Sequence, residues 1–243
     1  MKSRIYGDKI SIDPNQVNQF FEKRFYKDNP LASVMVRPGP DDGVAQKRNA
    51  NETALVENFL QNREHLRVLD LGCGTGRWAN NLGHKFSSYT GVDFTKSYIE
   101  AAKEIYAENK NYFFFNCSVT DIDHSIMSQE YDIVIINGLC VYLNDADVDF
   151  VFGYIDQLLA CGGLLYFRES VSIIQDRLTL KDYFSDELST QYNAIYRTPD
   201  EYEAVLKNKL PNCAVSHSGY LLDESTGARA ETNQKYWLLK KQA

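Results

Sequence analysis

The sequence predicts an α/β fold in which a mostly parallel sheet of seven strands carries helices on both faces and ends in an antiparallel hairpin. From Arg67 onward, short apolar runs alternate with longer amphipathic stretches, a pattern typical of parallel strands joined by helical crossovers. The apolar runs are nearly continuous, as expected for strands that are covered on both faces. The chain of 243 residues is long enough to bury one substantial core.

The elements of this sheet can be placed in order along the chain. Five strands are expected at Arg67–Leu71, Ser88–Asp93, Asn111–Asn116, Tyr131–Asn137 and Leu164–Glu169. Helices are expected between them at Arg77–Gly83, Lys96–Asn109 and Asp145–Ala160, and the glycines of Cys161-Gly162-Gly163 should end the last helix. The runs Cys213–Leu222 and Lys235–Lys240 predict two closing strands, paired as a hairpin at the sheet edge.

Two segments lie outside this alternating pattern. Ahead of the sheet, Gln16–Tyr26 and Val44–Leu60 have helical spacing and flank the turn-rich stretch Arg37–Gly43. We therefore expect an N-terminal helical cap over residues 1–60 and an α/β domain over residues 61–243, with residues 170–209 as an insertion that covers the substrate. Ligands of open α/β sheets bind beyond the carboxyl ends of the strands, and both segments can fold over that edge.

Composition excludes several classes of function. The net charge of −7 and the pI near 5.2 argue against a protein that grips nucleic acid through its phosphates. No apolar run is long enough for a membrane span and no secretory signal is visible, so a cytoplasmic protein is expected. The five cysteines are scattered without a C-x-x-C pair, and no metal is predicted. Oligomeric state is left open.

The strongest local signal is a glycine-rich loop after the first predicted strand. Gly72, Gly74 and Gly76 stand at alternate positions between a strand and a helix, where a tight turn lets the backbone approach a ligand. Asp70 precedes the glycines, and Asp93 ends the next strand 23 residues later, where a carboxylate can accept both hydroxyls of a ribose. The sequence therefore predicts a site for a nucleoside cofactor.

The run Val68–Gly76 resembles the first motif of class I S-adenosylmethionine-dependent methyltransferases, and Gly91-Val92-Asp93 is similar to their second motif. The resemblance covers about Arg67 to Ser170 and implies a Rossmann-like fold with S-adenosylmethionine as cofactor. A nicotinamide dehydrogenase more often has the spacing G-x-G-x-x-G, so the spacing G-x-G-x-G favours methyl transfer over hydride transfer.

The resemblance also implies roles for particular residues. Asp70 would organise water or the amino group, Asp93 would hold the ribose, and Phe94 would pack on the adenine face. Ser118 and Val119 would meet the adenine edge, and Asn137-Gly138 would lie beneath the sulfonium. The full set of expected cofactor contacts is Asp70, Gly72, Cys73, Gly74, Gly76, Trp78, Asp93, Phe94, Ser118, Val119, Asn137, Gly138 and Arg48.

Three residues at the carboxyl edge of the predicted sheet are candidates for catalysis. Tyr142 follows the fourth strand, and Arg168 and Glu169 end the fifth. Glu169 is placed either to take a proton from a hydroxyl or to pair with Arg168 and support the next loop, and the sequence leaves both interpretations open. Cys140 lacks the preceding proline of cytosine-C5 enzymes, and packing is the expected role for it.

The covering insertion places arginines beside tyrosines in Arg177–Phe184 and Tyr192–Pro199, which suits an anionic or sugar-bearing acceptor unless the segment is simply a solvated loop. These segments, together with Ser33–Val36 and Lys47–Asn49 upstream, are loosely similar to bacterial methyltransferases of surface-polysaccharide biosynthesis. The resemblance implies that Tyr26, Met35 and Arg48 help to close the cofactor pocket. The leading hypothesis is O-methylation of a hydroxyl on a small anionic or sugar-containing acceptor. The alternatives are N-methylation of an amino sugar or small amine, and cofactor binding without catalysis.

Overall fold

The computed structural model describes residues 4–27, 43–186, 188–223, 226 and 229–242. The large sheet has the order β4-β3-β2-β5-β6-β10-β9 and confirms the predicted seven strands. The first five strands are parallel, whereas β10 runs antiparallel to both β6 and β9. Their bounds are β2 Leu66–Leu71, β3 Phe86–Asp93, β4 Tyr112–Asn116, β5 Tyr131–Asn137, β6 Leu159–Ser172, β9 Cys213–Tyr220 and β10 Thr232–Lys241.

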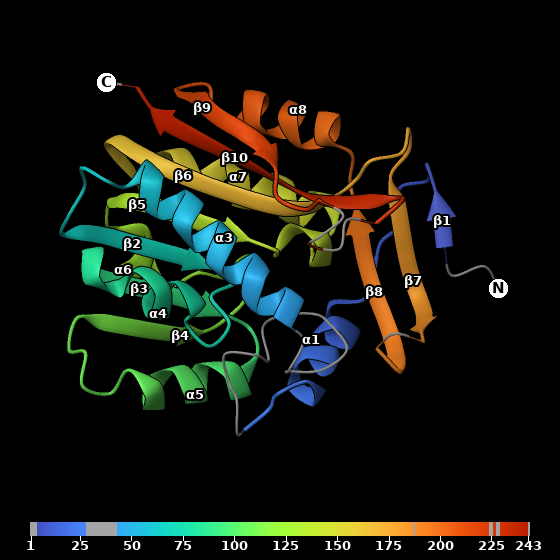
Figure 1. Cartoon of the computed structure of the whole chain (residues 1–243), viewed down its shortest axis with the longest axis horizontal. Coiled ribbons are helices and arrows are strands. Elements are labelled where there is room, and N and C mark those ends of the chain that lie inside the picture. The colour runs from blue at the N-terminus through green and yellow to red at the C-terminus, as the bar shows by residue number, and fades with distance from the viewer. Residues whose placement is uncertain (1–3, 28–42, 187, 224–225, 227–228, 243) are drawn as a thin grey trace.

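Helices cover both faces of this sheet, as expected, because side chains along the central strands point alternately to opposite sides. On β5, Val134 and Ile136 pack with α6, α7 and α8, whereas Ile133 and Ile135 pack with α3, α4 and α5. Figure 1 shows α3 crossing one face of the sheet. The helices are α3 Gly43–Phe59, α4 Arg77–Leu82, α5 Lys96–Ile105, α6 His124–Met127, α7 Asp145–Leu158 and α8 Pro199–Lys209.

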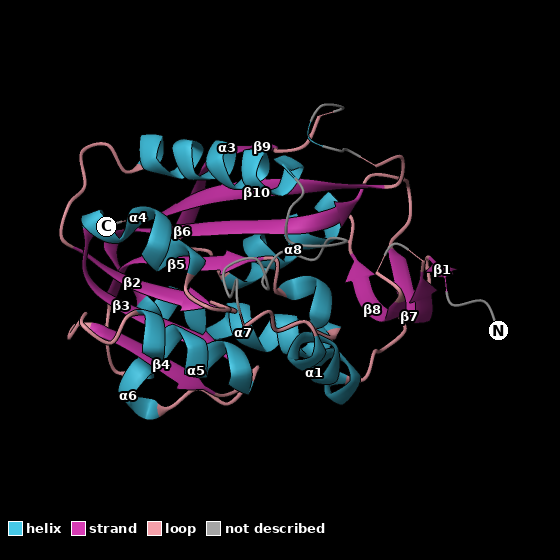
Figure 2. Cartoon of the chain, turned by 60° about the horizontal axis from the view of Figure 1, so that its bottom comes forward, coloured by secondary structure: helices cyan, strands magenta, loops and turns pink. Residues whose placement is uncertain are grey.

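A second, smaller sheet stands at one end of the molecule, beyond the carboxyl ends of the parallel strands (Figure 2). It consists of β1 Arg4–Tyr6, β7 Leu178–Ser185 and β8 Thr190–Tyr196, all antiparallel. The helix α1 Pro14–Lys23 packs on it through Val17, Phe20 and Phe21. The predicted covering insertion is therefore an ordered sheet that incorporates an N-terminal strand.

Two differences from the predicted elements have a local cause. The helix α7 ends at Leu158, one residue before an extended Leu159 that pairs with Tyr131, so Cys161-Gly162-Gly163 already lies inside β6. The helix α8 inside the insertion was not predicted, although Thr198 and Glu201 form a capping box and Pro199 occupies the first turn. The turn at Arg37–Gly43 lies almost wholly outside the described residues.

Candidate functional site

One cavity of about 650 Å³ lies at the carboxyl ends of β2, β3 and β5. Its walls come from the glycine loop on one side, and from α1, the small sheet and the turn after β5 on the other. That turn is the 3-10 helix η2, Cys140–Tyr142. The cavity therefore joins the expected cofactor site to the expected acceptor side, as the rule for open α/β sheets requires.

The glycine loop forms the floor of one half of the cavity. The backbone N–H groups of Gly72 and Cys73 both donate to the carbonyl of Val92, at 2.8 and 3.0 Å, which fixes the loop against β3. Gly72 has a φ of +78°, and a Cβ there would lie 3.2 Å from the side chain of Leu139. Gly76 does not line the cavity; it begins α4 with a φ of +87° and accepts a hydrogen bond from Tyr106.

Two buried carboxylates flank this loop. Asp93 accepts hydrogen bonds from the backbone N–H of Gly74 at 2.9 Å and of Thr95 at 2.8 Å, and burial raises its pKa. Asp70 accepts a hydrogen bond from the Tyr89 hydroxyl; burial raises the pKa of Asp70 to about 7, although this bond opposes the shift. Both carboxylates line the cavity.

Most of the predicted cofactor residues lie around this half of the cavity. Twelve of them line it, namely Asp70, Gly72, Cys73, Gly74, Trp78, Asp93, Phe94, Ser118, Val119, Asn137, Gly138 and Arg48. The guanidinium of Arg48 also donates to the backbone carbonyl of Thr226, which ties α3 to the connection between β9 and β10. Tyr26 is not among the lining residues, and Met35 lies outside the described ranges.

Sequence reasoning missed Glu52, the centre of a charged cluster at the base of the cavity. Glu52, on α3, is only 5% exposed and binds Arg168 and Arg77, each with a shortest N–O distance of 3.0 Å. It also accepts hydrogen bonds from Asn137 at 2.8 Å and Tyr166 at 2.9 Å. Burial alone would raise the pKa of Glu52, but the two guanidinium groups hold it well below its usual range.

A signal for this cluster was present in the sequence. Glu52 lies four residues before Val56 and seven after Ala45, so all three share the buried face of the predicted helix. A carboxylate on such a face needs a buried cation. The sequence does not show that Arg168, 116 residues later, would supply it.

The three candidate catalytic residues occupy different places. Tyr142 lines the cavity, and its hydroxyl lies 2.9 Å from that of Tyr192 on β8. Arg168 also lines it but is paired with Glu52 rather than with Glu169. Glu169 is fully buried behind η2, does not line the cavity, and accepts hydrogen bonds from the backbone N–H groups of Cys140, Val141 and Ser170. Through these contacts Glu169 supports the backbone around η2.

An aromatic wall faces the glycine loop across the cavity. Phe21 meets Tyr142 edge to face with ring centroids 4.9 Å apart, and Tyr142 meets Tyr192 at 6.2 Å. Tyr196 and Tyr183 extend this wall along the small sheet. Burial raises the pKa of Tyr142 well above its usual value, so its hydroxyl stays protonated.

The arginines of the insertion do not have the predicted role. The sequence left two interpretations open for Arg177 and Arg197, an anionic acceptor or a solvated loop, but neither arginine lines the cavity and both are buried against Asp145. Arg177 also binds Glu201. Buried guanidinium groups require partners of this kind, so the two arginines are parts of the scaffold.

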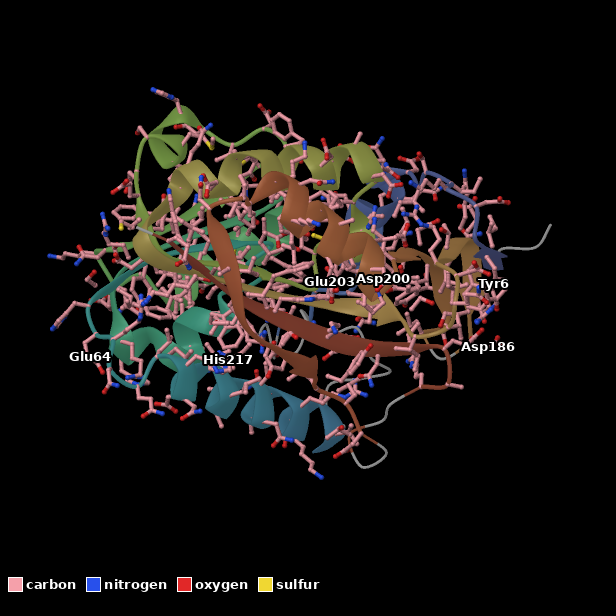
Figure 3. The ribbon with its side chains drawn as sticks, turned by 90° about the horizontal axis from the view of Figure 1, so that it is seen from above. Tyr6, Glu64, Asp186, Asp200, Glu203 and His217 are labelled. Carbon is pink, nitrogen blue, oxygen red and sulfur yellow. The ribbon has the colours of Figure 1, made fainter. Side chains whose placement is uncertain are left out.

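The cysteine after β5 and the histidines, for which the sequence favours packing or structural roles, lie outside the site. Cys140 is buried in the core, and none of His65, His84, His124 and His217 belongs to the described cavity wall. Figure 3 shows His217 on the side of α3, far from Tyr6 and Asp186 at the end that carries the small sheet. Within the described residues, no group of three metal-binding side chains gathers and no helix has the length and apolarity that crossing a membrane requires.

The residues of the glycine-loop half fit a nucleoside linked to an amino acid. Asp93 offers a carboxylate at a strand end, Phe94 an apolar ring beside it, and Arg48 and Arg77 cations near the loop. The buried Nε1 of Trp78 and Oδ1 of Asn137 have no hydrogen-bond partner among the described atoms. A polar ligand in this cavity would bring donors and acceptors close to these groups.

Comparisons with known proteins agree with this geometry. A family model described as a methyltransferase domain matches residues 69–165. Residues 69–165 of the chain therefore form a methyltransferase domain. Phosphoethanolamine N-methyltransferase 3 of Arabidopsis thaliana is 27% identical over 187 residues, which cover 76% of this chain and 36% of that relative. The chain thus spans about a third of the length of this relative.

Relatives with different acceptors share this domain. Malonyl-[acyl-carrier protein] O-methyltransferase of Bacillus cytotoxicus is 36% identical over 126 residues, covering 51% of this chain and 42% of that relative. The structure of Haemonchus contortus phosphoethanolamine N-methyltransferase 1, with phosphoethanolamine and S-adenosylhomocysteine, covers 94% of this chain and 49% of that one. Its TM-score of 0.71 at 22% identity shows that the fold is shared.

Proposed function

We propose that this protein binds S-adenosylmethionine and transfers its methyl group to the nitrogen of a small anionic acceptor. The observation that carries the proposal is that the glycine loop and the aromatic wall face each other across one shared cavity. When bound, S-adenosylmethionine supplies an electrophilic methyl group on a sulfonium. The chain must then hold the acceptor in line with that methyl group and exclude water, which are the main sources of rate acceleration in such a displacement.

The aromatic wall supports an amine as acceptor. The faces and edges of Phe21, Tyr142 and Tyr192 surround one end of the cavity. Aromatic rings attract ammonium groups through their negative faces, at about 0.5 to 2 kcal/mol per contact. Such a wall can hold the acceptor amine, and also its methylated product, against the glycine-loop side.

Two arginines support an anionic group on the acceptor. Arg4 and Arg229 line the end of the cavity at the small sheet. Burial raises the pKa values of Tyr192 and Tyr196, and the Arg229 charge opposes this shift, which places the guanidinium within range of both hydroxyls. Because Arg229 lies near the hydroxyls of the aromatic wall, it is the candidate for the acceptor anion, and Arg4 is paired with Glu231.

Four of the five carboxylates that line the cavity are engaged within the fold, and the fifth, Asp186, is exposed at the turn after β7, which argues against a hydroxyl acceptor that needs a base. Glu52 is paired with two arginines, and Asp93 accepts two backbone N–H groups. Asp147 is used in the N-terminal capping box of α7, and Asp70 is bonded to the Tyr89 hydroxyl. O-methylation of a sugar hydroxyl, and with it a place in polysaccharide biosynthesis, therefore has less support than N-methylation.

A matched pair of acceptors tests the proposal. Purified protein with S-adenosylmethionine is offered phosphoethanolamine and 2-hydroxyethyl phosphate, which differ only in the amine or hydroxyl, and release of S-adenosylhomocysteine is measured. Amino sugars, sugar phosphates and nucleotide sugars complete the panel. Turnover of anionic amines without turnover of the matching alcohols is expected. Turnover confined to hydroxyl acceptors, or silence across the panel with cofactor binding confirmed, would refute the proposal.

The variant Arg229→Ala tests where the anionic group of the acceptor binds. Arg229→Ala is expected to raise the acceptor KM at least tenfold, because a charge-assisted hydrogen bond contributes about 1.5 to 3 kcal/mol. The matched control is Arg67→Ala, which removes a partly exposed arginine that pairs with Asp132 and does not line the cavity. Equal KM values for the two variants would contradict this location.

A further inference from the structure

The turn η2 carries Tyr142 into the aromatic wall, yet it is a weak element by itself. It spans three residues, and its backbone bonds are Tyr142 N–H to Leu139 O at 2.9 Å and Leu143 N–H to Cys140 O at 3.3 Å. Short 3-10 turns have poor hydrogen-bond geometry and leave most backbone groups without a partner. Their position must therefore be fixed by the surrounding side chains.

A carboxylate holds the N–H groups of this turn. Glu169 Oε2 accepts hydrogen bonds from the backbone N–H of Cys140 at 2.6 Å and of Val141 at 3.3 Å. Its Oε1 accepts from Ser170 N–H at 2.8 Å, so both oxygens of the carboxylate are used. The side chain is fully buried at the end of β6.

A guanidinium holds the carbonyl groups of the same turn. Arg197 Nη1 donates to the Cys140 carbonyl at 2.7 Å, and Nη2 donates to the Leu143 carbonyl at 2.8 Å. Asp145, at the start of α7, accepts from Nε and Nη2 of the same arginine. Because guanidinium is planar and rigid, these bonds fix the turn relative to both β8 and α7.

We propose that Glu169 and Arg197 are positioning residues that hold η2 from opposite sides and thereby place Tyr142 in the acceptor wall. That the aromatic wall binds the acceptor rests on the proposed function. The contacts of Glu169 and Arg197 with η2, which we call the clamp, are a property of the fold. Glu169 acts through the backbone of Cys140 and Val141 and takes no proton from the acceptor. Both side chains bind the backbone of η2, and Arg197 is in addition paired with Asp145.

The chain offers a matched control for Arg197. Arg177 is equally buried, at 4% side-chain exposure against 3%, and binds the same carboxylate of Asp145. Its other ionic partner is Glu201 on α8, and its guanidinium binds carboxylates within the described residues rather than the backbone of η2. Replacing either arginine with lysine removes a planar set of hydrogen-bond donors and should lower the stability of the fold to a similar degree. Only Arg197→Lys is expected to loosen η2.

Amide hydrogen exchange tests the clamp without any acceptor. In Glu169→Gln and Arg197→Lys, the amides of Cys140 and Val141 are expected to exchange at least tenfold faster than in the wild type. In Arg177→Lys they should exchange at the wild-type rate. Equal protection of these two amides in Arg197→Lys and Arg177→Lys would overturn the proposal, even if the protein methylates no amine.

Kinetics then separate positioning from proton transfer. For the acceptor on which the wild type turns over, Arg197→Lys should raise the acceptor KM at least fivefold while the cofactor Kd stays within twofold. Glu169→Gln should behave likewise and keep kcat within about fivefold at saturating acceptor. If Glu169→Gln instead lowers kcat a hundredfold or more and removes the acidic limb of the kcat pH profile, Glu169 is the base and the inference is wrong.

Discussion

Replacing Glu52 by alanine tests whether the cluster at the base of the cavity ties α3 to the sheet. In the native protein, this carboxylate receives hydrogen bonds from two guanidinium groups, one amide and one phenol. Glu52→Ala leaves Arg77 and Arg168 without that partner, while their side chains remain only 13% exposed. Arg77 keeps its hydrogen bond to Asn49, which lies on the same helix as Glu52.

The expected cost follows from the burial of these charges. Removing one member of a buried ion pair commonly destabilises a protein by about 3 to 5 kcal/mol, because the remaining charge is left uncompensated. Partial exposure of both arginines allows some water to reach them, so we expect a loss near the lower end, about 3 kcal/mol. In a chain of this size that corresponds to a fall of about 6 to 12 °C in Tm.

The same helix supplies the control. Glu57 is 50% exposed and pairs with His84 at 3.3 Å, an arrangement that contributes at most about 1 kcal/mol. Urea unfolding followed by circular dichroism is measured for the wild type, Glu52→Ala and Glu57→Ala. A difference of less than about 1 kcal/mol between the two variants, with unchanged m-values, would refute the reasoning.

Three further outcomes are expected. Asp93→Ala should weaken S-adenosylmethionine binding more than tenfold in calorimetry, and unchanged affinity would exclude a ribose contact. Because the native pKa of Asp70 is raised to about 7 from 3.8, its ionisation destabilises the fold as pH rises from about 4 to about 7; Asp70→Asn should reduce that slope in thermal unfolding. Gly76→Ala should lower the free energy of unfolding by about 1 to 3 kcal/mol, because the φ of +87° is strained for alanine and the added Cβ would lie 2.6 Å from a ring carbon of Tyr106. The control Gly153→Ala, in the middle of α7 with no atom within 4 Å of the added Cβ, should be neutral or stabilising.

The glycine-loop half of the cavity could be predicted from the sequence because its information is local. The strand β5 has the predicted bounds, Asp93 is the last residue of β3, and the glycine loop and Phe94 directly follow β2 and β3. Strand ends fix the direction of these residues without knowledge of distant contacts. The exception, Gly76, is used for its left-handed φ at the start of α4 rather than for approach to a ligand.

The acceptor half could not be predicted in the same way, because it is assembled from distant segments. The strand β1 has three residues and exists only through its pairing with β7, more than 170 residues later. Arg177 and Arg197 carry the same local pattern as ligand-binding arginines, but Asp145 lies close enough to neutralise both. The identity of the partner, rather than the identity of the arginine, decides between scaffold and site.

The pairing of buried charges also constrains the chemistry of the acceptor. An amine with a pKa near that of lysine, about 10.4, reaches its neutral, nucleophilic form at pH 7 for about 4.6 kcal/mol, at 1.36 kcal/mol per pKa unit. A hydroxyl with a pKa near that of water, 15.7, needs about 12 kcal/mol to reach its anion without a base. Glu52, Asp93 and Glu169 are each bound to partners within the fold. The proposed site is therefore better suited to an amine, with its smaller free energy of deprotonation, than to a hydroxyl.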